Sequence, residues 1–359
     1  MKHILKRSLT IICLSSVLIL GVNGVGWTGQ SFEPMTLLAN GSMFPPVAPE
    51  GRAFKYFCDE VTKRTDGKIK FNHVWTSSLT KPGEELDALG SGVGDVAIVV
   101  TIFYWNKLYL NQFTEAVPFK PSDPMKQFEL IRKVHKQIPA LGEEWKRNKT
   151  RLLAPFVTVE NHVQAREPIK TLADFKGKKI DITGYYPGKS MEAVGGVLVA
   201  VSLPDTAMAL QTGTIDVEVL SLTATYPFGI WKFAPYVTII GHGAYIGVSI
   251  AANLKKFNSF SPELQNIFVE TAWDASKYFA KGQVGFLKKI IKETKEKGVK
   301  YYDLSWEDKV KWANLMDDYP LDWINKGRKR GLPTEKVMKL YLELIKETGH
   351  KFPREWKID

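Results

Sequence analysis

The chain has 359 residues, of which 44% are hydrophobic and 24% are charged, and its formal net charge is +11. This composition is typical of soluble globular proteins and argues against disordered and fibrous classes, while the length favours two compact lobes. After residue 30, no apolar run reaches the roughly 18 residues that a membrane-spanning helix needs. Much of the positive charge lies in segments such as 286–300, where Lys alternates with Glu. This pattern indicates solvated helix faces, so we expect no nucleic-acid partner.

The N-terminus has the pattern of a secretory signal peptide. A basic start over residues 2–7 precedes an apolar run over 9–22, and small residues follow it. The run is short for a spanning helix, so we expect residues 1–29 to be a cleaved signal and the protein to reach the periplasm. An uncleaved membrane anchor is the alternative. Cleavage would leave Cys58 as the only cysteine, which excludes an intramolecular disulfide.

The segment that follows predicts alternating strands and helices. We expect strands at 35–40, 68–75 and 95–100, with helices at 51–65 and within 81–92. The helix boundaries are supported by Pro and Gly at the positions that helix ends prefer. A strand–helix–strand–helix–strand order implies a parallel sheet with helices packed on its faces.

A second segment repeats this order. We expect strands at 178–183, 199–203 and 214–220, with helices at 189–197 and 204–213. The fold class that follows is α/β, with two similar lobes.

One nine-residue phrase occurs once in each segment. The chain reads ALGSGVGDV at 88–96 and ALQTGTIDV at 209–217, and five of the nine positions are identical. The shared Gly provides a positive φ where a helix ends, and the shared Asp can accept hydrogen bonds from backbone amides at the start of the next strand. The repeat therefore indicates the same helix-to-strand turn in two related lobes.

Two extended stretches, 151–170 and 241–253, are predicted to cross between the lobes and to form a hinge with a ligand cleft. The remainder is mostly helical, and 350–359 is expected to be a loose tail. The predicted organisation is lobe 1 at 30–155 with part of 246–285, lobe 2 at 156–245 with part of 286–359, and helices within 261–350 that pack across both lobes.

Motifs for catalysis are absent from the sequence. There is no nucleophile elbow, zinc-protease helix, phosphate-binding loop or paired-cysteine motif. The six histidines include no pair at helical metal-ligand spacing, and the glycines do not match a dinucleotide fingerprint. We therefore expect no enzyme activity, no cofactor and no metal, which leaves capture of a solute as the leading hypothesis.

Specific phrases resemble a known family. REPIKTLADFKGKKIDITG at 166–184, ALQTGTIDVEVL at 209–220, GVGDVAIV at 92–99 and SPELQ at 261–265 are similar to the solute receptors of tripartite ATP-independent periplasmic (TRAP) transporters, the DctP family. The resemblance runs from about residue 35 to about 300. It implies a two-lobe periplasmic solute-binding fold joined by a hinge. It also implies a receptor that delivers a small organic acid to a permease made of a small and a large membrane subunit.

The chain departs from the family where most members bind a carboxylate. Asp181 stands where the family usually has Arg, Leu220 where an Asn is common, and Asn161 near a position that is sometimes Arg. A carboxylate facing Asp181 would meet a like charge, at a cost on the order of 4 kcal/mol at 4 Å and an effective dielectric constant of 20.

Three explanations of this departure are open. The ligand is not a simple carboxylate, or another cation such as Arg166, Arg151 or Lys189 replaces the missing Arg. In the third, Asp181 turns away and pairs with Lys178 or Lys179.

The resemblance and the ends of the predicted strands together define a candidate site. Its residues are Asp181, Asn161, Thr101, Tyr104, Phe44, Tyr185, Glu218, Leu220, Ser221, Arg166 and Tyr245. The many aromatic side chains near these strand ends would suit a flat or apolar solute, and an amine held by Asp181 with cation–π support would also fit. The alternative function is a periplasmic sensing subunit that signals to a membrane kinase or chemoreceptor.

Overall fold

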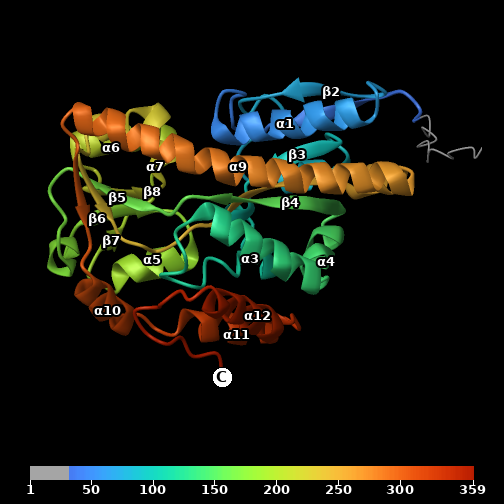
Figure 1. Ribbon diagram of the computed structural model, residues 1–359. Helices are drawn as coiled ribbons and strands as arrows, with labels where there is room; N and C mark the ends of the chain where they lie inside the picture. The colour runs from blue at the N-terminus through green and yellow to red at the C-terminus, as the bar shows by residue number, and fades with distance from the viewer. Residues whose placement is uncertain (1–31) are drawn as a thin grey trace, which may run out of the picture. The chain divides into compact units, whose positions relative to one another are not determined.

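The computed structural model describes residues 32–359, so the predicted signal peptide lies outside the described residues. Within this part of the chain, no helix is long and apolar enough to cross a membrane. The described chain is a mixed α/β fold with two sheets, each covered by helices (Figure 1).

The first sheet, with its covering helices, is called lobe 1 below. It has five strands in the order β2 (Ile69–Val74), β1 (Met35–Asn40), β3 (Val96–Val99), β10 (Tyr245–Asn253) and β4 (Thr150–Thr158). Its helices are α1 (Pro49–Arg64), α2 (Glu85–Ser91), α3 (Pro124–Gln137), α4 (Ala140–Arg147) and α8 (Leu254–Asn258).

The second sheet and its helices are called lobe 2. Its six strands have the order β11 (Lys300–Asp303), β9 (Tyr236–Ile239), β5 (His162–Ala165), β8 (Val217–Leu220), β6 (Lys179–Ile182) and β7 (Val197–Leu198). The helices α5 (Tyr185–Glu192), α6 (Thr206–Thr212) and α7 (Leu222–Thr225) belong to this part of the chain.

The repeated phrase has the predicted role in both lobes. Gly92 ends α2 and Gly213 ends α6, both with left-handed φ values, of 92° and 73°. Asp95 then accepts a hydrogen bond from the backbone amide of Leu38 at 2.7 Å, and Asp216 accepts one from Lys179 at 2.9 Å. In each lobe the Asp of the repeated phrase therefore links the new strand to its neighbour, because its side chain takes the place of one backbone acceptor between the two strands.

The strands of the predicted strand–helix order pair in parallel, as expected, whereas one strand in each lobe, which lies in a predicted crossing, is antiparallel. β10 pairs antiparallel with β3 and β4, and β5 pairs antiparallel with β8 and β9. Both strands follow a crossing from the other lobe, so each runs against the strands that the local strand–helix repeat builds. This reversal depends on long-range pairing and has no local signal.

The strand expected at 199–203 is also shorter and earlier. β7 comprises only Val197 and Leu198 beside β6. The ladder stops because the amide of Val201 donates to the side chain of Asp181 at 3.3 Å, not to a backbone carbonyl. The predicted helix at 189–197 likewise begins earlier, at Tyr185.

Three segments join the lobes. β4 leads into β5, β9 leads into β10, and α9 (Pro262–Glu296) is a 35-residue helix that packs on β4, α1 and α3 and also on α7. Figure 1 shows α9 running from the α1 side of the molecule to the α6 and α7 side. The last helices are α10 (Trp306–Leu315), α11 (Tyr319–Arg328) and α12 (Thr334–Glu347), of which α12 packs on α3.

The prediction of a loose C-terminal tail is wrong. Arg354 donates to the carbonyl of Met316 at 3.0 Å and to Asp318 at 2.9 Å. The Arg354 guanidinium lies 4.4 Å from the ring centroid of Trp356, which is only 8% exposed. The tail is ordered because the burial of the Trp356 indole and the partly buried ion pair of Arg354 offset the conformational entropy that a short segment loses on ordering.

Candidate ligand-binding cleft

The carboxyl ends of the parallel strands in both lobes meet the two strand crossings. β6 and β8 end at Ile182 and Leu220, and β5 begins opposite Leu220 at His162, directly after the first crossing. In lobe 1, β10 begins at Tyr245, opposite Thr158 at the end of β4. Ligands of α/β proteins bind at the carboxyl ends of the strands, so this junction is the expected place for a site.

A small cavity of about 20 Å³ lies at this junction, with room for about one water molecule. Its lining residues include Glu115, Lys120, Asn161, Tyr186, His242 and Tyr245. The Tyr245 hydroxyl donates to Asn161 Oδ1 at 3.0 Å, which joins the two crossings. Two residues of the predicted site, Asn161 and Tyr245, are therefore brought together across a cavity.

Asp181 and Glu218 form an acid pair beside this junction. They lie opposite each other on β6 and β8, are 8% and 3% exposed, and share a side-chain hydrogen bond. Burial raises the pKa of both carboxyls, and the neighbouring Asp181 charge adds to the rise for Glu218. The hydrogen bond between the two carboxyls opposes the effect of burial on the pKa of Asp181 and adds to it at Glu218.

The two lysines beside Asp181 do not neutralise it. Lys178 forms an ion pair with Glu167 at 2.5 Å, and the Lys179 ammonium donates to the Gly213 carbonyl. Alternation along the strand places Lys178 on the face opposite to Asp181, whereas Lys179 lies on the same face and its ammonium is taken by the Gly213 carbonyl. The structure therefore gives no support to the explanation in which Asp181 pairs with a neighbouring lysine.

A second group of charges lies around Lys120. Its ammonium donates to the His242 carbonyl at 3.2 Å, and the carboxylates of Glu115 and Glu160 both act on it. Burial raises the pKa of Glu115 and Glu160 and lowers that of Lys120. Burial also lowers the pKa of His242 to about 3, so its imidazole is neutral at pH 7.

Tyr245 links the two groups of charges. Burial raises the pKa of its phenol, and the carboxylates of Glu115, Glu50 and Glu218 raise it further. These three acids come from a lobe 1 loop, the first turn of α1 and lobe 2. Carboxylates of both lobes therefore act on a single hydroxyl group at the crossing.

Two other predicted site residues serve lobe 1 itself. Thr101 is fully buried, and its hydroxyl lies 2.8 Å from that of Ser249 on β10. The Tyr104 hydroxyl donates to Glu85 at 2.7 Å and accepts from the Leu86 amide at 3.0 Å. Both side chains have their hydrogen-bonding capacity used within the lobe, so the structure gives them a positioning role.

The remaining predicted residues lie at strand and helix ends. Phe44 is half-buried in the loop after β1, and Leu220 ends β8, where its carbonyl accepts from Gln164. Ser221 is buried and accepts from the Thr223 hydroxyl at 3.3 Å. Tyr185 is 44% exposed, with the Lys326 ammonium 4.3 Å from its ring centroid.

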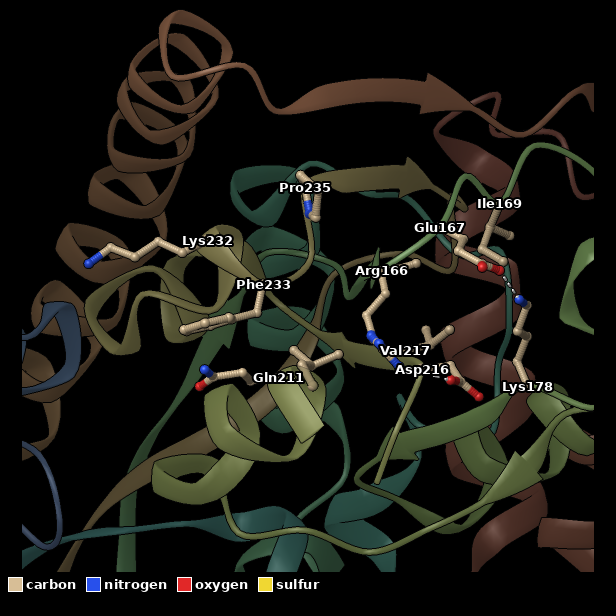
Figure 2. Close-up of a pocket in the computed structure, with 12 residues that line it drawn as sticks. Arg166, Glu167, Ile169, Lys178, Gln211, Asp216, Val217, Lys232, Phe233 and Pro235 are labelled. Carbon is tan, nitrogen blue, oxygen red and sulfur yellow. Dashed lines mark hydrogen bonds and ion pairs between the residues drawn. The ribbon is translucent and has the colours of Figure 1, made fainter. Parts of the chain in front are cut away.

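Arg166 lies away from the other predicted residues. It follows β5, whereas Asn161 precedes β5, so the two are separated by the length of the strand, roughly 16 Å. Arg166 lines a different pocket of about 610 Å³ at the amino ends of β6 and β8, shown in Figure 2. There it faces Asp216, with 3.7 Å between the charged atoms. The structure does not bring Arg166 to the junction.

Sequence reasoning missed several charged residues at the junction. Glu115 and Lys120 flank the segment AVPF at 116–119, and Glu50 lies in the first turn of α1. Glu160 directly precedes Asn161. The available signal was an acidic residue beside a short apolar segment, but a surface position explains such a residue equally well until its burial is known.

The acid in the first turn of α1 predicts a pH dependence of stability. Burial raises the pKa of Glu50 from 4.5 to about 7, and Arg52 only partly opposes this. Between these two values the native protein binds more protons than the unfolded chain, so the free energy of unfolding falls as the pH rises through this window. We expect Glu50→Gln to flatten this decline in urea titrations of the ligand-free protein.

The matched control for this experiment is Glu263→Gln, because Glu263 also follows a Pro in the first turn of a long helix. This variant loses a first-turn carboxylate without touching the junction and should retain the wild-type decline. An unchanged decline in Glu50→Gln would contradict the assignment of this pH dependence to Glu50.

Comparisons with known proteins identify the family and the fold. A family model described as "Bacterial extracellular solute-binding protein, family 7" matches residues 41–325. The C4-dicarboxylate-binding protein DctB of Bacillus subtilis is 23% identical over 275 residues, which is 75% of this chain and 77% of that protein.

Solved structures show the same fold. A TRAP periplasmic solute-binding protein from Desulfovibrio salexigens superposes with a TM-score of 0.77 at 18% identity, covering 88% of this chain and 97% of that one. A marine-metagenome TRAP protein specific for aromatic acids, in complex with 3-hydroxybenzoate, has a TM-score of 0.76 at 21% identity and covers 88% and 99%. The match to the family model spans well over half of the sequence, and the chain therefore belongs to family 7 of the bacterial extracellular solute-binding proteins, the DctP family.

Proposed function

We propose that the chain serves a TRAP transporter in the periplasm, capturing one small organic solute between its lobes and delivering it to a permease with a small and a large membrane subunit. The observation that carries this proposal is the convergence of the strand ends of both sheets on one buried polar junction. The TRAP solute-binding proteins of the same fold support it. The site at this junction comprises Asp181, Glu218, Asn161 and Tyr245, with Phe44, Leu220 and Ser221 at its edges.

The two lobes are proposed to close about the crossings near 155–161 and 240–245. This places 30–155 with part of 246–285 in lobe 1, and 156–245 with part of 286–359 in lobe 2. The positions of two later strands support this division, because β10 belongs to the sheet of lobe 1 and β11 belongs to the sheet of lobe 2. A cavity as small as 20 Å³ could admit an organic solute only if the lobes separated first.

Solute binding should therefore change both shape and stability. The experiment is mass spectrometry of small molecules that copurify with the periplasmic protein, followed by their removal and readdition. We expect readdition to reduce the radius of gyration in small-angle scattering, because the lobes move as rigid bodies. The melting temperature should also rise with solute concentration by mass action. A confirmed solute that left the scattering curve unchanged would argue against the hinge.

Uptake assays test the partner. Cells that express this chain with a TRAP permease of the same genome should accumulate the copurified solute, and cells that lack the permease should not. Uptake that persists without the permease would contradict the proposed partner.

A further inference from the structure

We propose that the cleft binds its solute through a positively charged nitrogen group, an ammonium or an amidinium, and that Asp181 and Glu218 supply the opposing charge. The inference rests on the proposed receptor function and names the chemical class of its solute.

The first observation is a set of acids that make no direct ion pair. Glu115, Glu160, Asp181 and Glu218 are buried around the junction, and the half-buried Glu50 acts on Tyr245 from the first turn of α1. Among residues 32–359, none of these five forms an ion pair. Buried acids are ordinarily paired, because an isolated charge in a low dielectric is costly. An unpaired acidic set at a cleft therefore indicates a place for a cation that comes from outside the chain.

The second observation concerns buried polar atoms without hydrogen bonds. Glu160 Oε2 has no partner, and neither does Nε2 of His242, which lines the cavity and is 9% exposed, while the Glu218 carboxyl has only Asp181 as a partner. Gln164, which lies opposite Glu218, cannot serve it, because its amide group bonds the Leu220 carbonyl and the hydroxyl of Thr225. Buried acceptors without a hydrogen bond in a native protein indicate that a donor from outside the chain binds there. An ammonium group can supply up to three N–H donors.

The basic residues that could replace the family's arginine are engaged elsewhere. Arg166 faces Asp216 at the other end of β5. Lys189 forms an ion pair with Glu192 at 2.7 Å. Arg151 lies at the end of β4 away from the junction, where its guanidinium stacks 5.5 Å from an aromatic ring. None of the three is placed to receive a carboxylate beside Asp181.

Lys120 is the basic residue that lines the cavity, and it does not reverse the balance of charge. Two acids, Glu115 and Glu160, already act on its ammonium. Lys309 also acts on Glu160, so these two acids face two cations, and the excess of negative charge at the junction is that of Asp181 and Glu218. A carboxylate solute would increase this excess, whereas a cationic solute would remove it.

The acid pair can exchange its proton for the solute. Burial and the neighbouring Asp181 charge raise the pKa of Glu218, which favours a protonated Glu218 in the ligand-free protein. When an ammonium group enters, Glu218 releases this proton to solvent and both carboxylates accept hydrogen bonds from the nitrogen. A metal ion is a poorer candidate, because no group of three or more metal-ligating side chains occurs in the described part of the chain.

The first experiment compares probes that match in size and differ in charge. 1,4-Diaminobutane is compared with succinate, and benzylamine with benzoate, by thermal shift and calorimetry on protein freed of copurified solute. We expect the amines to raise the melting temperature and the carboxylates to leave it unchanged. Amine binding should also release protons, measured as a dependence of the binding heat on the ionisation enthalpy of the buffer.

The second experiment uses Asp181→Asn and Glu218→Gln, with the exposed Asp205→Asn as the control. We expect each of the first two variants to weaken amine binding by at least about thirtyfold, the lower end of the scale for losing a buried charged contact. Their ligand-free melting temperatures should not fall, because an amide can make the hydrogen bond that the carboxyl makes, without the cost of burying a charge. The control should bind as wild type.

Distinct outcomes separate this inference from the receptor function. The inference of a cationic solute would be wrong if carboxylates stabilised the protein and amines did not, or if the copurified solute were an anion. Either result would still be consistent with the proposed receptor function. A ligand-free melting temperature that falls in both variants with unchanged amine affinity would show a structural acid pair and also overturn the inference of a cationic solute. Failure of the protein to bind any probe or copurified molecule would overturn the receptor proposal itself.

Discussion

Replacement of Trp312 by alanine should lower the free energy of unfolding by about 3–5 kcal/mol. The indole is fully buried, and its Nε1 donates to the Ser190 carbonyl at 2.7 Å. Its ring packs against Phe119, Phe175 and His242, with centroid distances of 5.8, 5.6 and 4.5 Å. The substitution would leave a large cavity and an unpaired carbonyl where α10 meets the junction. The cavity and the lost hydrogen bond would both destabilise the folded protein.

Trp306→Ala is the matched control, because it removes the same side chain from the first turn of the same helix. Trp306 is 54% exposed, and its loss should change the free energy of unfolding by less than about 0.5 kcal/mol. Urea denaturation of both variants measures the difference. Equal effects of the two substitutions would contradict the packing described around Trp312.

Gly243→Ala should cost about 2–5 kcal/mol and weaken solute binding. Gly243 lies in the second crossing at a φ of +92°, and an added Cβ would lie 2.2 Å from the carbonyl oxygen of Lys120. About 1–2 kcal/mol comes from the left-handed backbone. A further 1–3 kcal/mol or so comes from the collision, since neither backbone segment can move alone. The crossing would shift away from Lys120 and open the junction.

Gly298→Ala separates the two contributions. Gly298 has nearly the same φ, +93°, but no heavy atom lies within 4 Å of the position that an added Cβ would take. This variant should cost only the backbone strain, about 1–2 kcal/mol, and should bind the solute as wild type. Thermal denaturation and calorimetry of both variants test this, and an equal loss in the two would show that the close approach at Gly243 is unimportant.

The sequence determined the elements and their repetition. The helix in α1 follows from an apolar face at helical spacing, and residues 53, 54, 57, 58 and 61 of that face are buried. The repeated phrase predicted the turns at Gly92 and Gly213, because a glycine that ends a helix needs only its neighbours to specify its backbone. Such signals are local, so they are readable from one chain. The family resemblance added the two-lobe fold and the receptor function.

Only the tertiary structure decided the environment of the site. Sequence alone left it open whether Asp181 pairs with a neighbouring lysine, and the register of β6 against β8 places it opposite Glu218. The reversed strands β5 and β10, the ordered tail at Arg354 and the remote position of Arg166 also follow from pairings between distant segments. A shift of one residue in the register of a strand would move each of its side chains to the opposite face of the sheet. The charge of this cleft is therefore set by long-range register, which local sequence patterns do not encode.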